Sequence, residues 1–222
     1  MEEARRLSHV PTLAIALTHA SWTGWFVRLE PGSLVRVADE HLALAIEHGL
    51  EHFRMWALIH RGWSLAGLGR ADDGIPLLAA GLRDLGYISF RPLSLTLLAD
   101  ACRMAGQWRV SLAHLAEARG LAEEREVGWW QAETLRLTGD VLLATSDAAA
   151  AEASYCAAMA VAQQQSAKLW ELGAAMSLAR LWRDQGKRTE ARDLLAPVYG
   201  WFTEGFDTPV LQDAKALLDE LA

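Results

Sequence analysis

Residues 151–158, Ala-Glu-Ala-Ser-Tyr-Cys-Ala-Ala, place a small residue at 151, a large one at 155 and a small one at 158. Offsets of four and three residues put these side chains on one face of an α-helix. The same arrangement occurs five times, with first residues 36, 37, 40 and 40 positions apart. The five trios are Ala38/Leu42/Ala45, Gly74/Leu78/Gly81, Ser111/Leu115/Ala118, Ala151/Tyr155/Ala158 and Ala191/Leu195/Val198. Repetition at this period predicts stacked helical hairpins.

Helical periodicity extends over almost the whole chain, and no segment alternates long enough for a strand. The expected helices cover residues 10–28, 33–49, 52–68, 72–85, 91–105, 107–125, 129–145, 147–165, 168–185, 187–203 and 208–221. Turn signals separate them at Glu30-Pro31-Gly32, Gly69, Gly106, Thr145-Ser146-Asp147 and Gly186. The three isolated glycines suit the left-handed conformation that ends a helix. Pro197 predicts a kink or break in its helix, and Thr208 is the expected N-cap of the last one.

The predicted architecture is an all-α solenoid of about five hairpins. Residues 1–9 are predicted to be the remnant of a preceding repeat helix, and residues 10–205 the repeat array. Residues 206–222 form an amphipathic segment suited to capping the array.

Composition limits the classes of partner. The formal net charge of −7 argues against nucleic-acid binding, which needs a basic surface. No segment resembles a signal peptide or reaches the length of a membrane span, so the expected location is the cytoplasm. Cys102 and Cys156 lie within helical apolar patterns and are expected to be reduced thiols in the core.

The trios occupy the positions of the small–large–small signature of tetratricopeptide (TPR) repeats, which implies a right-handed superhelix. Two strings, Gly128-Trp129-Trp130-Gln131-Ala132-Glu133 through Gly139 and 178–208, resemble the C-terminal repeat region of bacterial multidomain predicted ATPases and adenylate/guanylate cyclases. The resemblance covers most of the chain and departs from that group near Tyr87–Phe90, where the connector is short. It implies a regulatory or partner-binding module of a signalling protein.

Aligning the repeats places one aromatic group on the inner face of a first helix. The group consists of Trp56, Ile59, His60 and Trp63, and His19/Trp22 repeats the spacing of His60/Trp63. These side chains either pack between hairpins or form an aromatic wall in a concave groove that holds a peptide or an apolar ligand.

The same alignment places charged residues on the inner face further along the chain. They are Asp100, Arg103, Glu133, Arg136, Asp140, Arg180, Arg183 and Asp184. Arginines in a groove can bind partner carboxylates through paired hydrogen bonds. Alternatively, Arg136/Asp140 and Arg180/Asp184 are i,i+4 pairs that satisfy each other.

Catalytic and metal motifs are incomplete. Gly186-Lys187 is followed by Arg188 where a P-loop has Ser or Thr. His48 and His52 have no evident third ligand for a zinc ion. The expected function is therefore non-catalytic binding of a protein or peptide, without a cofactor or metal. The alternative is a small-molecule sensor with its ligand in the aromatic groove, and self-association through the N-terminal end is a further expectation.

Overall fold

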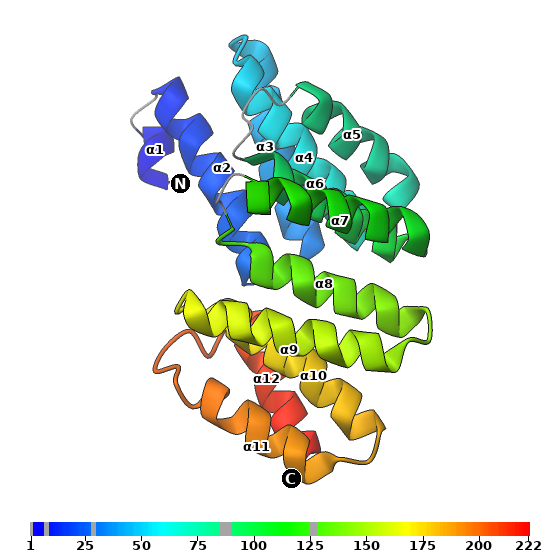
Figure 1. The fold of residues 1–222 in the computed structure, drawn as a ribbon. Coiled ribbons are helices and arrows are strands. Elements are labelled where there is room, and N and C mark those ends of the chain that lie inside the picture. Colours follow the sequence, from blue (N-terminus) through cyan, green and yellow to red (C-terminus); the bar gives the residue numbers. More distant parts are fainter. Residues whose placement is uncertain (1, 7–8, 28–29, 85–89, 125–127) are drawn as a thin grey trace. The chain divides into compact units, whose positions relative to one another are not determined.

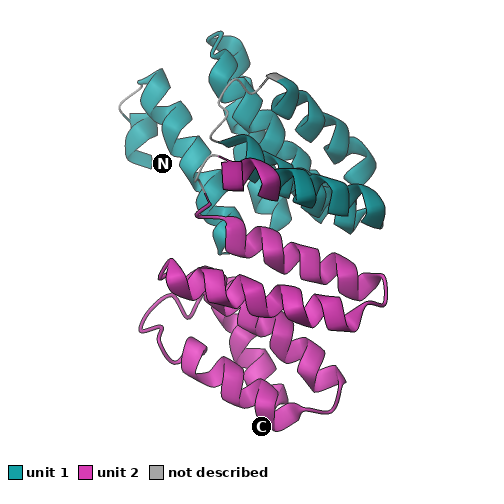
Figure 2. Cartoon of the chain, viewed as in Figure 1, with its two compact units in different colours: residues 1–118 teal, residues 119–222 magenta. Residues whose placement is uncertain are grey.

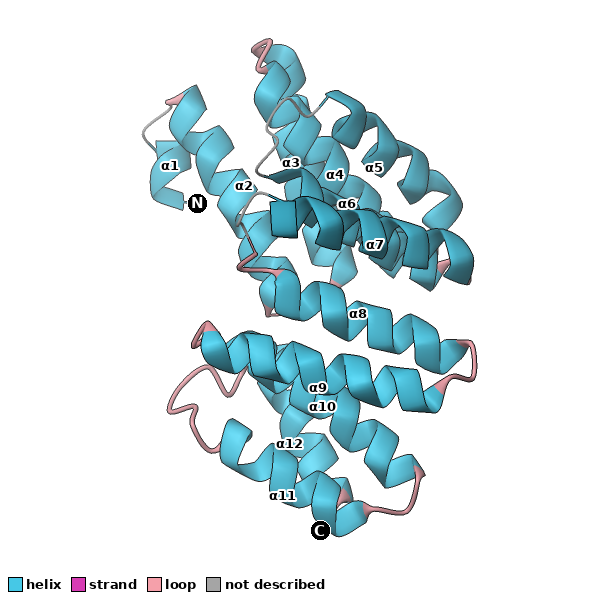
Figure 3. Ribbon diagram, viewed as in Figure 1, coloured by secondary structure: helices cyan, strands magenta, loops and turns pink. Residues whose placement is uncertain are grey.

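The computed structural model describes residues 2–6, 9–27, 30–84, 90–124 and 128–222, which form helices and turns with no β-strand among them (Figures 1 and 3). The helices are α1 Glu2–Arg6, α2 Val10–Phe26, α3 Pro31–Glu47, α4 Glu51–Gly67, α5 Ala71–Asp84, α6 Arg91–Met104, α7 Trp108–Glu124, α8 Gln131–Ala144, α9 Ala148–Gln164, α10 Lys168–Asp184, α11 Arg188–Tyr199 and α12 Pro209–Glu220. Their order and their lengths confirm the predicted all-α repeat solenoid. No described helix is both long and apolar enough to cross a bilayer.

The chain divides into two compact units, Met1–Ala118 and Arg119–Ala222 (Figure 2). In unit 1, the first helix of each hairpin packs on the first helix of the next, since α4 contacts both α2 and α6. The second helices α3 and α5 each pack on α4 as well. Unit 1 therefore has an inner layer of first helices and an outer layer of second helices.

Unit 2 follows the same plan around one central helix. α10 contacts α8 and α12, and it also packs against α9 and α11. α8, α10 and α12 thus form the layer that corresponds to the first helices. The helix α12 packs on α10 and α11.

The trio residues are packing residues on the second helix of each hairpin. The side chains of Leu78, Tyr155 and Leu195 are each no more than 1% exposed. At the α4–α5 crossing, a Cβ on Gly62 would lie 2.5 Å from the carbonyl oxygen of Gly74, so the two backbones are in contact. The first trio differs, because Leu42 is only half-buried.

Helix ends follow the predicted left-handed closures. Gly69, Gly106 and Gly186 have φ of 77°, 71° and 82°. Two further helices end in the same conformation with serine, since Ser146 has φ 68° and Ser166 has φ 53°. Residue type alone does not predict these two closures, because serine carries a Cβ that disfavours positive φ.

Three local predictions are wrong. Pro31 and Gly32 begin α3 instead of forming a turn, because the Glu30 carboxylate accepts hydrogen bonds from the backbone N–H groups of Gly32 and Ser33 at 3.0 Å. The helix α11 continues past Pro197 but ends at Tyr199, short of residue 203. Thr208 occupies the N-cap position without capping, since its hydroxyl donates to the Gly205 carbonyl.

The two cysteines have different surroundings. Cys102 is buried, as predicted, whereas Cys156 is exposed and does not belong to the core. The helix α9 is rich in alanine, so its apolar pattern does not distinguish the buried face from the exposed one. The short connector expected near residues 87–90 lies largely outside the described residues.

Candidate functional site

Aromatic side chains gather on the inner layer of unit 1. The ring centroid of Trp22 on α2 lies 5.2 Å from that of Trp56 and 5.1 Å from that of His60, both on α4. His60 also stacks on Trp56 at 5.8 Å with an interplanar angle of 25°. The ring centroids of Trp25 and Trp63 lie 6.4 Å apart. We call Trp22, Trp25, Trp56, His60 and Trp63 the aromatic cluster.

The four residues predicted for the inner face of α4 differ in their exposure. Trp56, Ile59 and His60 are buried, with 4%, 0% and 5% of their surfaces exposed. Trp63 is half-buried, as is Trp22 on the neighbouring helix. Trp56 therefore packs between elements, while the indoles of Trp22 and Trp63 are the members of the cluster that a partner can reach.

A small cavity lies within this cluster. Its wall includes the rings of Trp22, Trp25, His60 and Trp63 and the side chains of Ser21 and Ser64. The cavity is about the size of a single water molecule. In this conformation the cavity accepts one hydrogen-bonding group and not a whole ring.

His60 is the unusual member of the cavity wall. Neither Nδ1 nor Nε2 of its ring has a hydrogen-bond partner among the described residues. Burial, with a smaller contribution from His41, lowers the pKa of His60 to about 3, so the ring is neutral at physiological pH. A buried donor and acceptor without partners cost free energy.

His41 on α3 is a second buried histidine in unit 1. It is 0% exposed, and its Nε2 lies 3.3 Å from the hydroxyl of Thr18. Burial lowers the pKa of His41 to about 4, with a smaller contribution from His52. Helical spacing could have indicated this burial, because His41 lies three residues after Ala38 and four before Ala45, on the buried face of α3.

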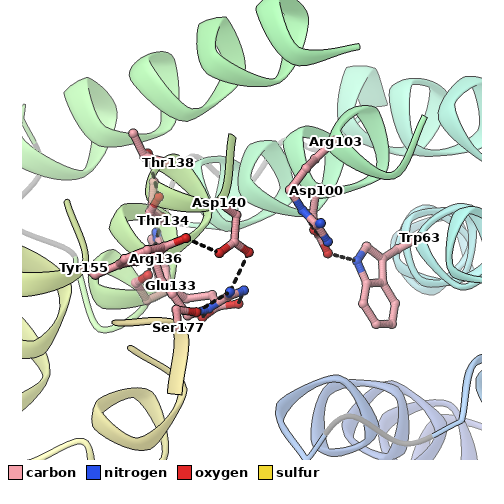
Figure 4. A network of polar contacts seen from close by, with 11 residues as sticks. Trp63, Asp100, Arg103, Glu133, Thr134, Arg136, Thr138, Asp140, Tyr155 and Ser177 are labelled. Carbon is pink, nitrogen blue, oxygen red and sulfur yellow. Dashed lines mark hydrogen bonds and ion pairs between the residues drawn. The ribbon is translucent and has the colours of Figure 1, made fainter. Parts of the chain in front are cut away.

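Trp63 connects the aromatic cluster to a buried carboxylate on α6. Its Nε1–H donates to Oδ2 of Asp100 at 2.8 Å (Figure 4). The guanidinium of Arg103 binds Oδ1 of the same carboxylate at 2.8 Å. Asp100 is only 5% exposed, and these two donors compensate for the burial of its charge.

A second polar network lies in unit 2. Arg136 on α8 binds both carboxylate oxygens of Glu133, at 2.6 and 2.7 Å, and Oδ2 of Asp140 at 2.7 Å (Figure 4). The Tyr155 hydroxyl donates to Oδ1 of Asp140 at 2.9 Å. Arg136 also lies 3.4 Å from the hydroxyl of Ser177 on α10. The predicted Arg136/Asp140 pair is therefore formed.

Two of the predicted charged residues, Arg180 and Arg183 on α10, bind acidic residues of α12. Arg180 donates to Oδ2 of Asp213 at 2.9 Å, so the predicted Arg180/Asp184 pair is wrong. Arg183 binds Asp184 at 2.9 Å and Glu220 at 2.5 Å. Both arginines bind α12 because it packs on α10 and carries Asp213 and Glu220.

Sequence reasoning missed several members of these sites. Trp25 lies three residues after Trp22, a spacing that shares a helix face and could have identified it. The roles of Tyr155 and Ser177 depend on contacts between helices and leave no local signal. No group of three or more histidine, cysteine or acidic side chains in the described part of the chain is arranged to hold a metal ion.

Comparisons with known proteins give the fold class. No family model and no curated protein matches the chain. BtubC (BKLC) from P. vanneervenii is similar in structure, with a TM-score of 0.62 and 14% identity over 88% of this chain and 89% of that one. A kinesin light chain-like protein of Podosopora anserina, with nearly identical TPR-like repeats, has a TM-score of 0.55 and 15% identity over 96% of each chain. At these identities the likeness shows the fold alone, a TPR-like repeat solenoid.

Proposed function

We propose that the chain is a non-catalytic scaffold that binds a protein or peptide on the inner layer of its helical hairpins. One observation carries the proposal, namely the half-buried Trp63 beside the Asp100–Arg103 ion pair in the inner layer of unit 1. Indole and guanidinium groups dominate the binding energy of many protein interfaces. TPR-like solenoids offer extended surfaces of this kind to partners.

The charges of the predicted groove suit binding better than acid–base chemistry. Glu133 is held by Arg136, and Asp100 is held by Trp63 and Arg103. Carboxylates fixed in this way orient their neighbours. A general acid or base would instead need free access to a reacting group.

The signalling context rests on the sequence resemblance of residues 128–139 and 178–208. On that basis the scaffold serves as a cytoplasmic regulatory module of a bacterial signalling ATPase or cyclase, and its partner is a protein or another domain of a longer chain. Self-association through residues 1–9 is a separate proposal, tested by sedimentation of a chain extended at its N-terminus.

A peptide selection tests the scaffold proposal. Displayed random peptides are selected on the full 222-residue chain, and the affinity of enriched peptides is measured by calorimetry. Trp63→Ala and Arg103→Ala are each expected to weaken binding at least about tenfold, as interface anchors do. Trp201→Ala is the matched control, because Trp201 is a 57% exposed tryptophan in unit 2. Unchanged affinity in a folded Trp63→Ala chain would show that this layer is not the binding face.

Small-molecule sensing is the second candidate function. It is favoured by the cavity beside Trp22 and Trp63 and by the two ring nitrogens of His60 that lack a partner among the described residues. A binding site commonly combines apolar walls with a few polar groups that fix the ligand.

A further inference from the structure

The cavity in the aromatic cluster offers a defined set of hydrogen-bonding groups. A neutral imidazole carries one donor and one acceptor, and neither has a protein partner at His60 in the described structure. The hydroxyl of Ser64 donates to the His60 carbonyl at 2.8 Å, and that of Ser21 donates to Leu17 at 3.1 Å. Each hydroxyl oxygen retains acceptor capacity. A group that both donates and accepts therefore complements this wall.

The cavity favours a neutral group. Its wall consists of four aromatic rings, two hydroxyl side chains and the aliphatic side chains of Leu34 and Leu97, none of which is ionised. A charged group placed there would lose its hydration without gaining a counter-ion. The nearby Asp100 does not supply one, because Trp63 and Arg103 already bind its carboxylate.

The size of the cavity determines how much of a ligand can enter it. A space of about the size of one water molecule accepts one hydroxyl group. The remainder of the ligand then lies against the half-buried indoles of Trp22 and Trp63 in the cavity wall. Flat faces of this kind favour a planar aromatic ring, which stacks on them or meets them edge-on.

We propose that this cavity binds a small neutral aromatic alcohol of the phenol class, with its hydroxyl against His60 and its ring on Trp22 and Trp63. The proposal rests on the second candidate function, that of a sensor, and is independent of peptide binding. The chemistry also matches a tyrosine side chain of a partner, and the two sources are separated by experiment.

The test is calorimetric titration of the full chain with phenol and with toluene, which has a similar shape and lacks the hydroxyl. We expect phenol to bind at least about tenfold more tightly, the factor associated with one hydrogen bond in a buried site. His60→Leu should reduce the ratio of the two affinities to about one, while His60→Gln, which keeps a donor and an acceptor, should retain the preference for phenol. Trp201→Phe, in unit 2, should change neither affinity.

Several results would overturn the proposal. They are equal affinities for phenol and toluene, a preference for phenol that survives His60→Leu, or no binding of phenol up to its solubility. Binding of a tyrosine-containing peptide without binding of phenol would also overturn it and would assign the hydroxyl to a partner side chain. The circular dichroism of each variant verifies folding. Failure of the peptide selection alone leaves the phenol result unaffected, so the two functions are tested separately.

Discussion

Arg136 shows how one residue can secure a whole polar network. Its side chain is 9% exposed, and it binds the equally buried Glu133 together with Asp140. Removing one partner of a buried ion pair is far more costly than losing an exposed pair, because a charge is left without compensation.

Arg136→Met is therefore expected to lower the free energy of unfolding by about 3–5 kcal/mol. The control is Arg180→Met, since Arg180 and Asp213 are 34% and 49% exposed and their pair is worth about 1 kcal/mol or less. Urea unfolding of the two variants measures the difference. Equal losses of stability would contradict the structural role of the buried network.

For single residues, the sequence predicts which side chains share a helix face better than it predicts their hydrogen-bond partners. The inner-face position of Trp56, His60 and Trp63 follows from helical periodicity and the repeat alignment. That the His60 nitrogens lack partners among the described residues does not follow, because it depends on what α2 and α6 place around the ring. Likewise, Arg180 meets Asp213 only because α12 packs on α10.

Helix closure is the first property that belongs to the elements. Gly186 has φ 82°, and a Cβ added there would have nothing within 4 Å. Gly186→Ala should therefore destabilise the chain through backbone strain alone, by about 1–2 kcal/mol. The opposite change, Ser166→Gly, relieves a serine at φ 53° and should stabilise the chain by up to about 1 kcal/mol. Thermal unfolding of both variants measures these shifts, and shifts of the same sign would refute this explanation.

The contact between α4 and α5 depends on glycine. Gly62→Ala would place a Cβ 2.5 Å from the Gly74 carbonyl oxygen and should cost about 1–3 kcal/mol or more. Gly120→Ala is the matched control, because Gly120 is exposed on α7 with no atom near its Cβ position. It should stabilise its helix by up to about 1 kcal/mol. Chemical denaturation compares the two, and a tolerated Gly62→Ala would mean that α4 and α5 can separate without loss.

Most of the fold could be predicted at the element scale. The hairpin order, most of the helix bounds and the closures at Gly69, Gly106 and Gly186 follow from periodicity and glycine placement. The errors arise where a side chain changes a local preference, as when the Glu30 carboxylate caps α3 and draws Pro31 into the helix. Ser166 adopts a glycine-like conformation in the short connection between α9 and α10, which no local propensity reveals.

Acid sensitivity is a property of the whole molecule with its origin in unit 1. His41 and His60 are neutral in the folded chain down to pH values of about 4 and 3, whereas unfolded histidines titrate near 6.5. Below pH 6.5 the unfolded state therefore binds more protons, and stability falls as the pH decreases. Above about pH 6.5 the two histidines are neutral in the folded and the unfolded state, so they cause no further change in stability with pH.

Each of the two histidines is expected to contribute a slope of roughly 1.4 kcal/mol per pH unit between about pH 6 and pH 4. Urea unfolding across this range measures the total slope. In the double variant His41→Gln/His60→Gln the total slope should be smaller by up to about twice this amount, since two proton-binding sites are lost. An unchanged slope would mean that these histidines gain protons in the folded state as readily as in the unfolded one.

The pairing of Gly139 with Tyr155 has an evolutionary consequence. A Cβ on Gly139 would lie 2.4 Å from the Tyr155 ring, and the hydroxyl of that ring binds Asp140. The equivalent positions of the next repeat hold alanine and leucine, Ala179 and Leu195. We therefore expect positions 139 and 155 to covary among related sequences, with alanine accompanied by leucine and glycine by tyrosine.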